Sequence, residues 1–117
     1  MRAAFAALAL SCLLATPALA QRSGTYAVEG AGADGSRYQG TAQLQATGPK
    51  TWSMTWRVAG DTSTGTGLLE SGLLVIGYLS NRETGVAIYA VQPDGSLLGM
   101  FTQGKDGEVG SERLLPR

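Results

Sequence analysis

The sequence contains no histidine, and its single cysteine, Cys12, lies near the amino terminus. Small exported domains are usually held together by disulfides, and a lone cysteine cannot form one within the chain. A serine or threonine nucleophile needs a base beside it, and without histidine none of them has an evident activator. We therefore expect stability to come from one packed core, and we predict that the protein is not an enzyme.

Charge of one sign is also lacking, because nine Lys/Arg residues balance nine Asp/Glu residues. No basic stripe exists to neutralise phosphates, which argues against nucleic acid as a partner. A metal site needs clustered ligands, whereas the aspartates stand singly beside glycines or after them: Asp34, Asp61, Asp94 and Asp106. We predict no metal and no cofactor. Glu29 and Glu70 would form an acid/base pair only if they met in space, and we interpret both as solvated charges.

A long membrane-spanning run is missing, and the first twenty residues look like a cleaved export signal. Arg2 precedes an apolar stretch over 3–15, and Ala18-Leu19-Ala20 forms a small-x-small cleavage site before Gln21. The apolar stretch is shorter than the roughly 20 residues that cross a bilayer. The alternative is a lipoprotein lipidated at Cys12. We expect a periplasmic or secreted protein with no integral membrane span, and a single β-barrel domain over 21–117.

Glycine and threonine are abundant, no segment has a useful helical period, and turn signals recur about every ten residues. This pattern predicts eight strands, over 25–30, 37–46, 51–58, 63–70, 72–79, 85–92, 96–103 and 108–115. Strands joined by such short turns are antiparallel neighbours. Closing the sheet removes both aggregation-prone edges. We predict an all-β fold, a small eight-stranded antiparallel up-and-down barrel, with a small β-sandwich as the alternative.

The segment 72–79 is the longest apolar run after the signal, and it follows the hairpin signal at 69–72. This strand and the two after it are apolar on both faces, although a barrel has only one inside. An outer apolar patch beyond a few hundred Å² is rare in a monomer. The sequence therefore predicts a homodimer, or a docking surface for an extracytoplasmic protein partner, built from Leu74, Ile76, Tyr78, Tyr89, Val91 and Met100. A flattened barrel, or one capped by the loop at 31–33, is the alternative.

Five aromatic residues are candidates for the barrel interior: Tyr26, Tyr38, Trp52, Trp56 and Phe101. Eight strands enclose a space that side chains just fill or that one small ligand occupies. Burial of large aromatic side chains contributes strongly to the stability of a small domain. We expect these residues to form a packed core, with a ligand-facing interior as the alternative.

Two stretches of the sequence echo each other. Tyr26-Ala27-Val28 leads to Asp34-Gly35-Ser36, and Tyr89-Ala90-Val91 leads to Asp94-Gly95-Ser96. Two hairpins that need the same turn chemistry explain this repetition, and an old duplication is the alternative.

The sequence resembles a group of short exported bacterial all-β proteins, some of which carry the label fibronectin-binding protein. The resemblance rests on turn glycines and core aromatics, over 24–30, 34–36, 38–41, Trp56, 65–67, 86–89 and 95–99. The opening Gly24-x-Tyr26 is also similar to the start of lipocalin and avidin-type barrels. These resemblances imply a barrel fold, and no binding residue is carried over from them.

We expect a non-enzymatic interaction module that binds a protein or surface polymer outside the cytoplasm. The first alternative is a lipocalin-like carrier of a small apolar ligand in the barrel interior. The second is an exported inhibitor of a cell-wall enzyme. The module would have its surplus of apolar surface on the outer wall, whereas the carrier would have it in an open cup.

Overall fold

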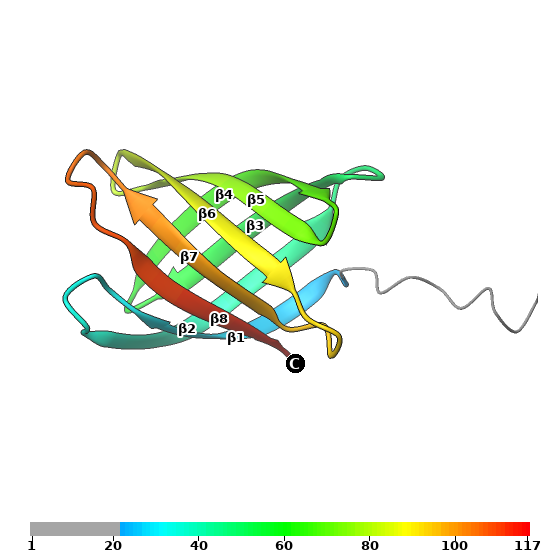
Figure 1. The fold of residues 1–117 in the computed structure, drawn as a ribbon, viewed down its shortest axis with the longest axis horizontal. Helices are drawn as coiled ribbons and strands as arrows, with labels where there is room; N and C mark the ends of the chain where they lie inside the picture. The colour runs from blue at the N-terminus through cyan, green and yellow to red at the C-terminus, as the bar shows by residue number, and fades with distance from the viewer. Residues whose placement is uncertain (1–21) are drawn as a thin grey trace, which may run out of the picture.

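The computed structural model describes residues 22–117 and shows one closed barrel of eight antiparallel strands (Figure 1). The strands are β1 (Gly24–Ala31), β2 (Arg37–Ala46), β3 (Thr51–Val58), β4 (Asp61–Glu70), β5 (Leu73–Ser80), β6 (Glu83–Val91), β7 (Leu97–Gln103) and β8 (Gly110–Pro116). Each strand pairs with the next, and β8 closes on β1. The predicted up-and-down barrel is confirmed, and the sandwich is excluded.

Two sequence-based expectations lie outside the described residues, namely the export signal over 1–20 and lipidation of Cys12. Among residues 22–117, no helix is both long enough and apolar enough to span a bilayer.

The hairpin connections follow from local turn chemistry. Ser71 and Gly72 both have positive φ, of 53° and 76°, which matches the mirror-type turn that suits the twist of paired strands. The predicted hairpin signal before β5 is therefore confirmed. Asn81 and Arg82 form the same kind of turn, with φ of 49° and 66°. This connection is shorter than the interval over 80–84 left between the expected strands, because β5 extends to Ser80 and β6 begins at Glu83.

The two Asp-Gly-Ser turns have the same hydrogen bonds. Asp34 Oδ1 accepts from the amide and hydroxyl of Ser36 at 3.0 and 2.7 Å. Asp94 Oδ1 accepts from the amide and hydroxyl of Ser96 at 2.9 and 2.6 Å. These hydrogen bonds hold the pKa of both carboxyls below the usual range, and the bond from the serine hydroxyl has the larger effect. Turn chemistry thus accounts for the Asp-Gly-Ser part of the sequence echo.

One end of the barrel, where both described termini lie, is filled by aliphatic side chains. The largest of them are fully buried: Leu44, Met54, Leu74, Leu97 and Leu114. Tyr26 is also buried there and donates its hydroxyl to the carbonyl of Arg22 at 2.6 Å, which ties the first described residues to this end. Each such aliphatic side chain contributes about 1.5–3 kcal/mol to the free energy of unfolding, so this half of the barrel anchors the fold.

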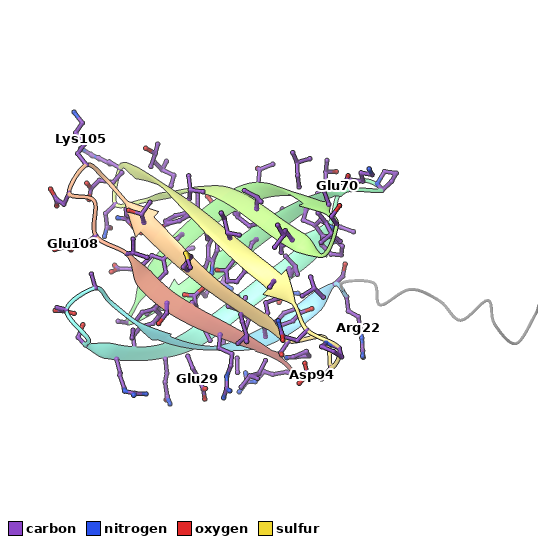
Figure 2. All side chains as sticks on the ribbon, viewed as in Figure 1. Arg22, Glu29, Glu70, Asp94, Lys105 and Glu108 are labelled. Atoms are coloured by element: carbon purple, nitrogen blue, oxygen red, sulfur yellow. The ribbon has the colours of Figure 1, made fainter. Side chains whose placement is uncertain are left out.

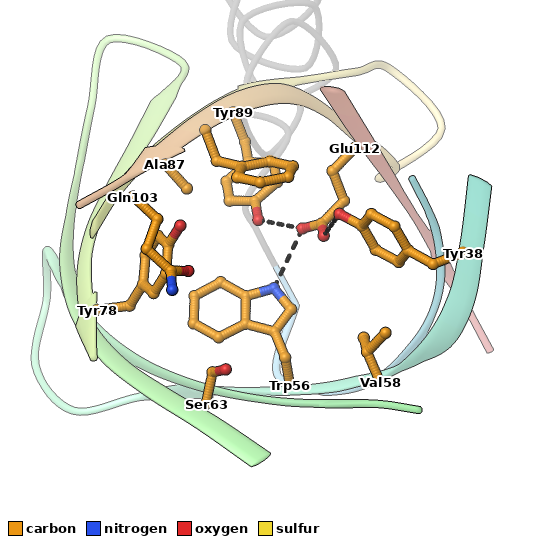
Figure 3. Close-up of a pocket in the computed structure, with 10 residues that line it drawn as sticks. Tyr38, Trp56, Val58, Ser63, Tyr78, Ala87, Tyr89, Gln103 and Glu112 are labelled. Carbon is orange, nitrogen blue, oxygen red and sulfur yellow. Dashed lines mark hydrogen bonds between the residues drawn. The ribbon is translucent and has the colours of Figure 1, made fainter. Parts of the chain in front are cut away.

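Toward the other end, four aromatic side chains each lie directly opposite a glycine of the neighbouring strand. The pairs are Tyr38 with Gly30, Tyr78 with Gly85, Tyr89 with Gly99, and Phe101 with Gly110. A Cβ atom at Gly85 would lie 2.6 Å from the Tyr78 hydroxyl oxygen, so a larger residue would displace the ring. The glycines let the rings lie against the barrel wall, and this leaves space between the rings at that end (Figure 3).

The predicted outer set is wrong for five of its six residues. Leu74, Ile76 and Tyr89 are fully buried, whereas Tyr78 and Val91 are half-buried and pack against the core. Only Met100 faces outward, with 58% of its surface exposed.

Glycines on β4 explain why β5 directs Leu73, Val75 and Leu79 outward. Gly65 and Gly67 point into the barrel, and Cβ atoms there would meet the side chain of Ile76. Ile76 therefore fills the space that these glycines leave. Because side chains alternate along a strand, Leu74 and Tyr78 point inward with it.

An apolar outer wall does exist, but it is made of the other set of side chains. Eight half-exposed aliphatic residues cover β4 to β7: Leu68, Leu73, Val75, Leu79, Val86, Ile88, Leu98 and Met100. We call this surface the apolar wall. One row crosses all four strands, because Val75 pairs with Leu68 on one side and with Ile88 on the other, and Ile88 pairs with Met100. The outer faces of β1 to β3 carry Thr, Gln, Ser and Arg instead.

Candidate functional site: a cup at the open end of the barrel

A cavity of about 190 Å³ opens at the end of the barrel opposite the termini (Figure 3). We call it the cup. Its lining comes from seven of the eight strands and consists of Tyr38, Trp56, Val58, Ser63, Tyr78, Ala87, Tyr89, Phe101, Gln103 and Glu112. Five of the ten lining residues are aromatic, so the cup is a largely apolar space with a few polar groups at fixed places.

The lining residues divide into a buried floor and a partly exposed rim. Trp56, Ala87, Tyr89 and Glu112 are buried and form the floor, and the other six are half-buried and form the rim. The mouth is bordered by the connections between β1 and β2, β3 and β4, β5 and β6, and β7 and β8. Lys105 and Glu108, in the last of these connections, point away from the barrel (Figure 2). Because the six rim side chains are only half-buried, the mouth is open to solvent.

The floor is organised around the carboxylate of Glu112, which is only 9% exposed. The hydroxyl of Tyr38 donates to Oε1 at 2.6 Å, and the hydroxyl of Tyr89 donates to Oε2 at 2.5 Å. The indole Nε1–H of Trp56 also donates to Oε2, at 3.1 Å (Figure 3). A buried carboxylate is costly unless it is hydrogen-bonded, and these three donors supply those bonds.

The tyrosines of the cup remain protonated donors over a wide pH range. Burial first, and the negative charge of Glu112 second, raises the pKa of Tyr78 to about 12. The same two causes raise the pKa of Tyr38 and Tyr89, to which the hydrogen bond with Glu112 adds a further rise. Tyr78 donates to the carbonyl of Thr102 at 3.1 Å, which holds its ring at the rim.

Trp52 contrasts with Trp56, although both point inward from β3. Trp56 bonds Glu112 through its indole, whereas the buried Nε1 of Trp52 has no hydrogen-bond partner among the described residues. Trp52 pairs across the sheet with Gly67 in the filled half of the barrel, away from the cup. The two tryptophans therefore report on different halves of the interior.

The five aromatic residues predicted from sequence for the interior all lie there, but in two places. Tyr38, Trp56 and Phe101 line the cup, whereas Tyr26 and Trp52 belong to the filled half. The predicted set is therefore divided between side chains packed in the filled half and side chains that line a cavity.

The two glutamates considered as an acid/base pair are exposed, and each has a basic partner. Glu29 accepts from Arg113 at 3.0 Å, and Glu70 accepts from Lys50 at 2.5 Å. Figure 2 shows both at the surface, away from the cup. Among residues 22–117, no three His, Cys, Asp or Glu side chains gather where they could hold a metal ion. The groups in the cup are suited to binding, because Glu112 accepts hydrogen bonds and the rings offer apolar faces.

Sequence reasoning missed Glu112, the residue around which the floor is built. Ser111-Glu112-Arg113 reads as an ordinary solvent-exposed stretch. One signal was present, since Glu112 stands two residues before Leu114 and therefore shares its face of the strand. That signal was ambiguous because Leu115, on the opposite face, is equally apolar.

No protein-family model and no curated protein matches the sequence. Among solved structures, the chain is similar to a redesigned β-barrel with a TM-score of 0.73 and 15% identity, over 81% of this chain and 90% of that one. It is also similar to the barrel EF1p2_mFAP2b bound to DFHBI, with a TM-score of 0.73 and 14% identity, over 81% and 93% of the two chains. The redesigned barrel mFAP1, bound to DFHBI, matches with a TM-score of 0.69 and 17% identity, over 80% and 93%. These similarities establish the fold.

Proposed function

We propose that this protein is an exported β-barrel that binds a small ligand in the cup. The observation that carries the proposal is the asymmetry of the interior. One half is packed by aliphatic side chains, whereas the other holds an open, aromatic-lined cavity with a hydrogen-bonded carboxylate at its floor. A barrel filled only for stability would have no need of a buried carboxylate beside an open cavity, because an unpaired buried charge is costly.

The cavity volume limits the size of the ligand. An apolar cavity of about 150 Å³ binds benzene, and drug-sized ligands occupy roughly 300–1,000 Å³. The cup, at about 190 Å³, suits a molecule with one ring and a short substituent. Designed barrels of the same fold have been solved with DFHBI bound, which supports the capacity of this architecture to hold a small ligand.

The carrier hypothesis thus takes precedence over the interaction module and over the cell-wall enzyme inhibitor. The proposed setting is outside the cytoplasm, because residues 1–20 have the charge, apolar and cleavage pattern of an export signal. Mass spectrometry of the exported protein tests this proposal. A chain that begins at Gln21 is the expected result, and a lipidated Cys12 would contradict it.

Small aromatic molecules are expected to change the intrinsic fluorescence of the protein in a saturable way. Trp56 lies in the floor of the cup, so a bound ring alters its surroundings, whereas Trp52 in the filled half is unaffected. The measurement is a fluorescence titration with benzyl alcohol, benzylammonium and indole. A Trp52→Phe variant assigns the signal to Trp56.

A matched pair of variants locates the binding site. Ser63 lies at the rim and pairs across the sheet with Trp56, so Ser63→Phe is expected to fill the cup and abolish the fluorescence change. Ser53→Phe, on the outer face of β3, is expected to leave the titration unchanged. If no probe gives a saturable signal with the folded wild-type protein, the proposed function is wrong.

We also propose that a second copy of the chain covers the apolar wall. Its eight half-exposed aliphatic side chains form one apolar surface over four neighbouring strands, and monomers rarely expose such patches beyond a few hundred Å². A stable interface buries about 800 Å² on each partner, and packing one apolar wall against another removes both from water. The central row of the wall consists of Leu68, Val75, Ile88 and Met100 and carries no charged side chain. Packing this row against the wall of a second copy therefore leaves no charge unpaired.

Sedimentation equilibrium is expected to show a dimer at micromolar concentrations. Ile88 lies in the middle of the central row, and Ile88→Lys is expected to yield a folded monomer because it places a charge within the interface. Gln45→Lys, on the polar outer face of β2, is the control and should remain dimeric. A wild-type monomer over this concentration range, or an Ile88→Lys dimer, would contradict the proposal.

A further inference from the structure

The charge of Glu112 has no basic partner among the described residues. The two ion pairs of residues 22–117 join Glu29 to Arg113 and Glu70 to Lys50, and both lie at the surface. The three groups that bond Glu112 are the neutral side chains of Tyr38, Trp56 and Tyr89. Its negative charge is therefore hydrogen-bonded but not neutralised.

The Glu112 carboxylate also retains acceptor capacity. A carboxylate has about four lone-pair positions, two on each oxygen. Oε2 accepts from both Trp56 and Tyr89, whereas Oε1 accepts only from Tyr38. One acceptor position on Oε1 is therefore left for a further donor, and Glu112 is part of the cup lining.

The side chains around this carboxylate are aromatic, and their ring planes are inclined to one another at steep angles. The rings of Trp56 and Tyr78 lie 5.3 Å apart at 59°, and those of Tyr38 and Phe101 lie 6.4 Å apart at 70°. Rings set at such angles surround a small space with several π-systems, and the faces of Trp, Tyr and Phe attract cations. Within residues 22–117, no Lys or Arg lines the cup.

A ligand that fills the cup removes water from Glu112, and this decides which ligand charge is favoured. A neutral ligand would leave the carboxylate desolvated and unneutralised, and an anion would add repulsion. A cation offsets the charge, donates to the remaining acceptor position and interacts with the rings.

We propose that the cup selects a small organic cation, namely a protonated amine carried on a single ring or a body of similar size. This inference rests on the proposed function and adds the chemical class of the ligand. The ammonium group lies against Glu112, and the apolar body lies among Trp56, Tyr78 and Phe101.

The test compares three probes that share one ring and differ in charge: benzylammonium, benzyl alcohol and benzoate. Each is titrated into the wild-type protein at neutral pH while the intrinsic fluorescence is followed, and the Trp52→Phe variant assigns the change to Trp56. Benzylammonium is expected to bind at least about tenfold more tightly than benzyl alcohol, and benzoate more weakly than either. Equal or tighter binding of benzyl alcohol or benzoate would overturn the selection of cations while leaving the proposed function intact. No saturable binding by any probe would overturn both.

A pair of isosteric substitutions assigns the preference to one carboxylate. Glu112→Gln keeps the size of the side chain and a carbonyl acceptor but removes the charge. The ratio of the affinity for benzylammonium to that for benzyl alcohol is therefore expected to fall toward one. Glu29→Gln removes the same charge from the outer wall and is expected to leave the ratio unchanged. An unchanged ratio in a folded Glu112→Gln protein would overturn the assignment. If that variant does not fold, the probe series on the wild-type protein decides the proposal alone.

Discussion

Replacing Gly99 with alanine is expected to lower the free energy of unfolding by about 3 kcal/mol. A Cβ atom at this position would lie 2.5 Å from the carbonyl oxygen of Ile88 on the paired strand and would also meet the ring of Tyr89. The ring has little room to move, because its hydroxyl is bonded to Glu112. Relief therefore requires a backbone shift between β6 and β7, and chemical denaturation measures the resulting loss.

Gly77→Ala is the matched control for this substitution. Gly77 lies in the middle of β5 and points outward, and a Cβ atom there would meet nothing within 4 Å. We expect this variant to match the wild type or to be more stable by about 0.5 kcal/mol, since alanine has fewer unfolded conformations to lose. Similar losses for the two variants would show that strand propensity, and not the ring packed over Gly99, sets the effect.

Glu112→Ala is expected to destabilise the protein by a similar amount, about 3 kcal/mol. Removing the carboxylate leaves the hydroxyl of Tyr89 and the indole N–H of Trp56 buried without an acceptor, and each unsatisfied group costs about 1–3 kcal/mol. Tyr38 loses less, because it is half-buried and its hydroxyl can turn to water. Denaturant unfolding monitored by fluorescence measures the change.

A second measurement separates the loss of the Glu112 network, that is, its hydrogen bonds with Tyr38, Trp56 and Tyr89, from a general loss of packing. The negative charge of Glu112 contributes to the raised pKa of Tyr78, which is about 12 in the wild type, so Glu112→Ala should move tyrosine ionisation to lower pH. Glu29→Ala breaks only an exposed ion pair and is expected to cost less than about 1 kcal/mol. A Glu112→Ala protein with wild-type stability would contradict the central role assigned to this network.

A tyrosine whose pKa is raised in the folded state stabilises the fold fully at pH values below its unfolded pKa of about 10. This stabilisation declines as the pH rises through the folded pKa, which for Tyr78 is about 12. The wild-type protein is therefore expected to lose stability above about pH 10, and the Glu112→Ala variant to show a weaker dependence in this range.

The eight strands and their order were predictable because each depends on neighbouring residues alone. The alternation of Trp52, Met54 and Trp56 marks β3, and Ser71-Gly72 marks the turn before β5. Short turns impose antiparallel pairing of consecutive strands, and eight strands with two open edges favour closure.

The inward face of β5 depends on its pairing with β4, and the existence of the cup depends on residues far apart in the chain. Leu74 and Val75 are equally apolar, so alternation alone cannot choose between them. Gly65 and Gly67 on β4 leave the space that Ile76 occupies, and Leu74 and Tyr78 share its face of the strand. The register across the sheet therefore decided which apolar set became core and which became the apolar wall.

The sequence by itself determined the fold class, the order of strands and the turns, because these follow from side-chain alternation and local backbone preference. The tertiary structure alone decided the site. Glu112 on β8 meets Tyr38 on β2, Trp56 on β3 and Tyr89 on β6 only after the barrel closes, at sequence separations of 74, 56 and 23 residues. No local pattern encodes such a meeting, since it depends on the register of every strand pair between these residues and on the glycines that make room for the rings.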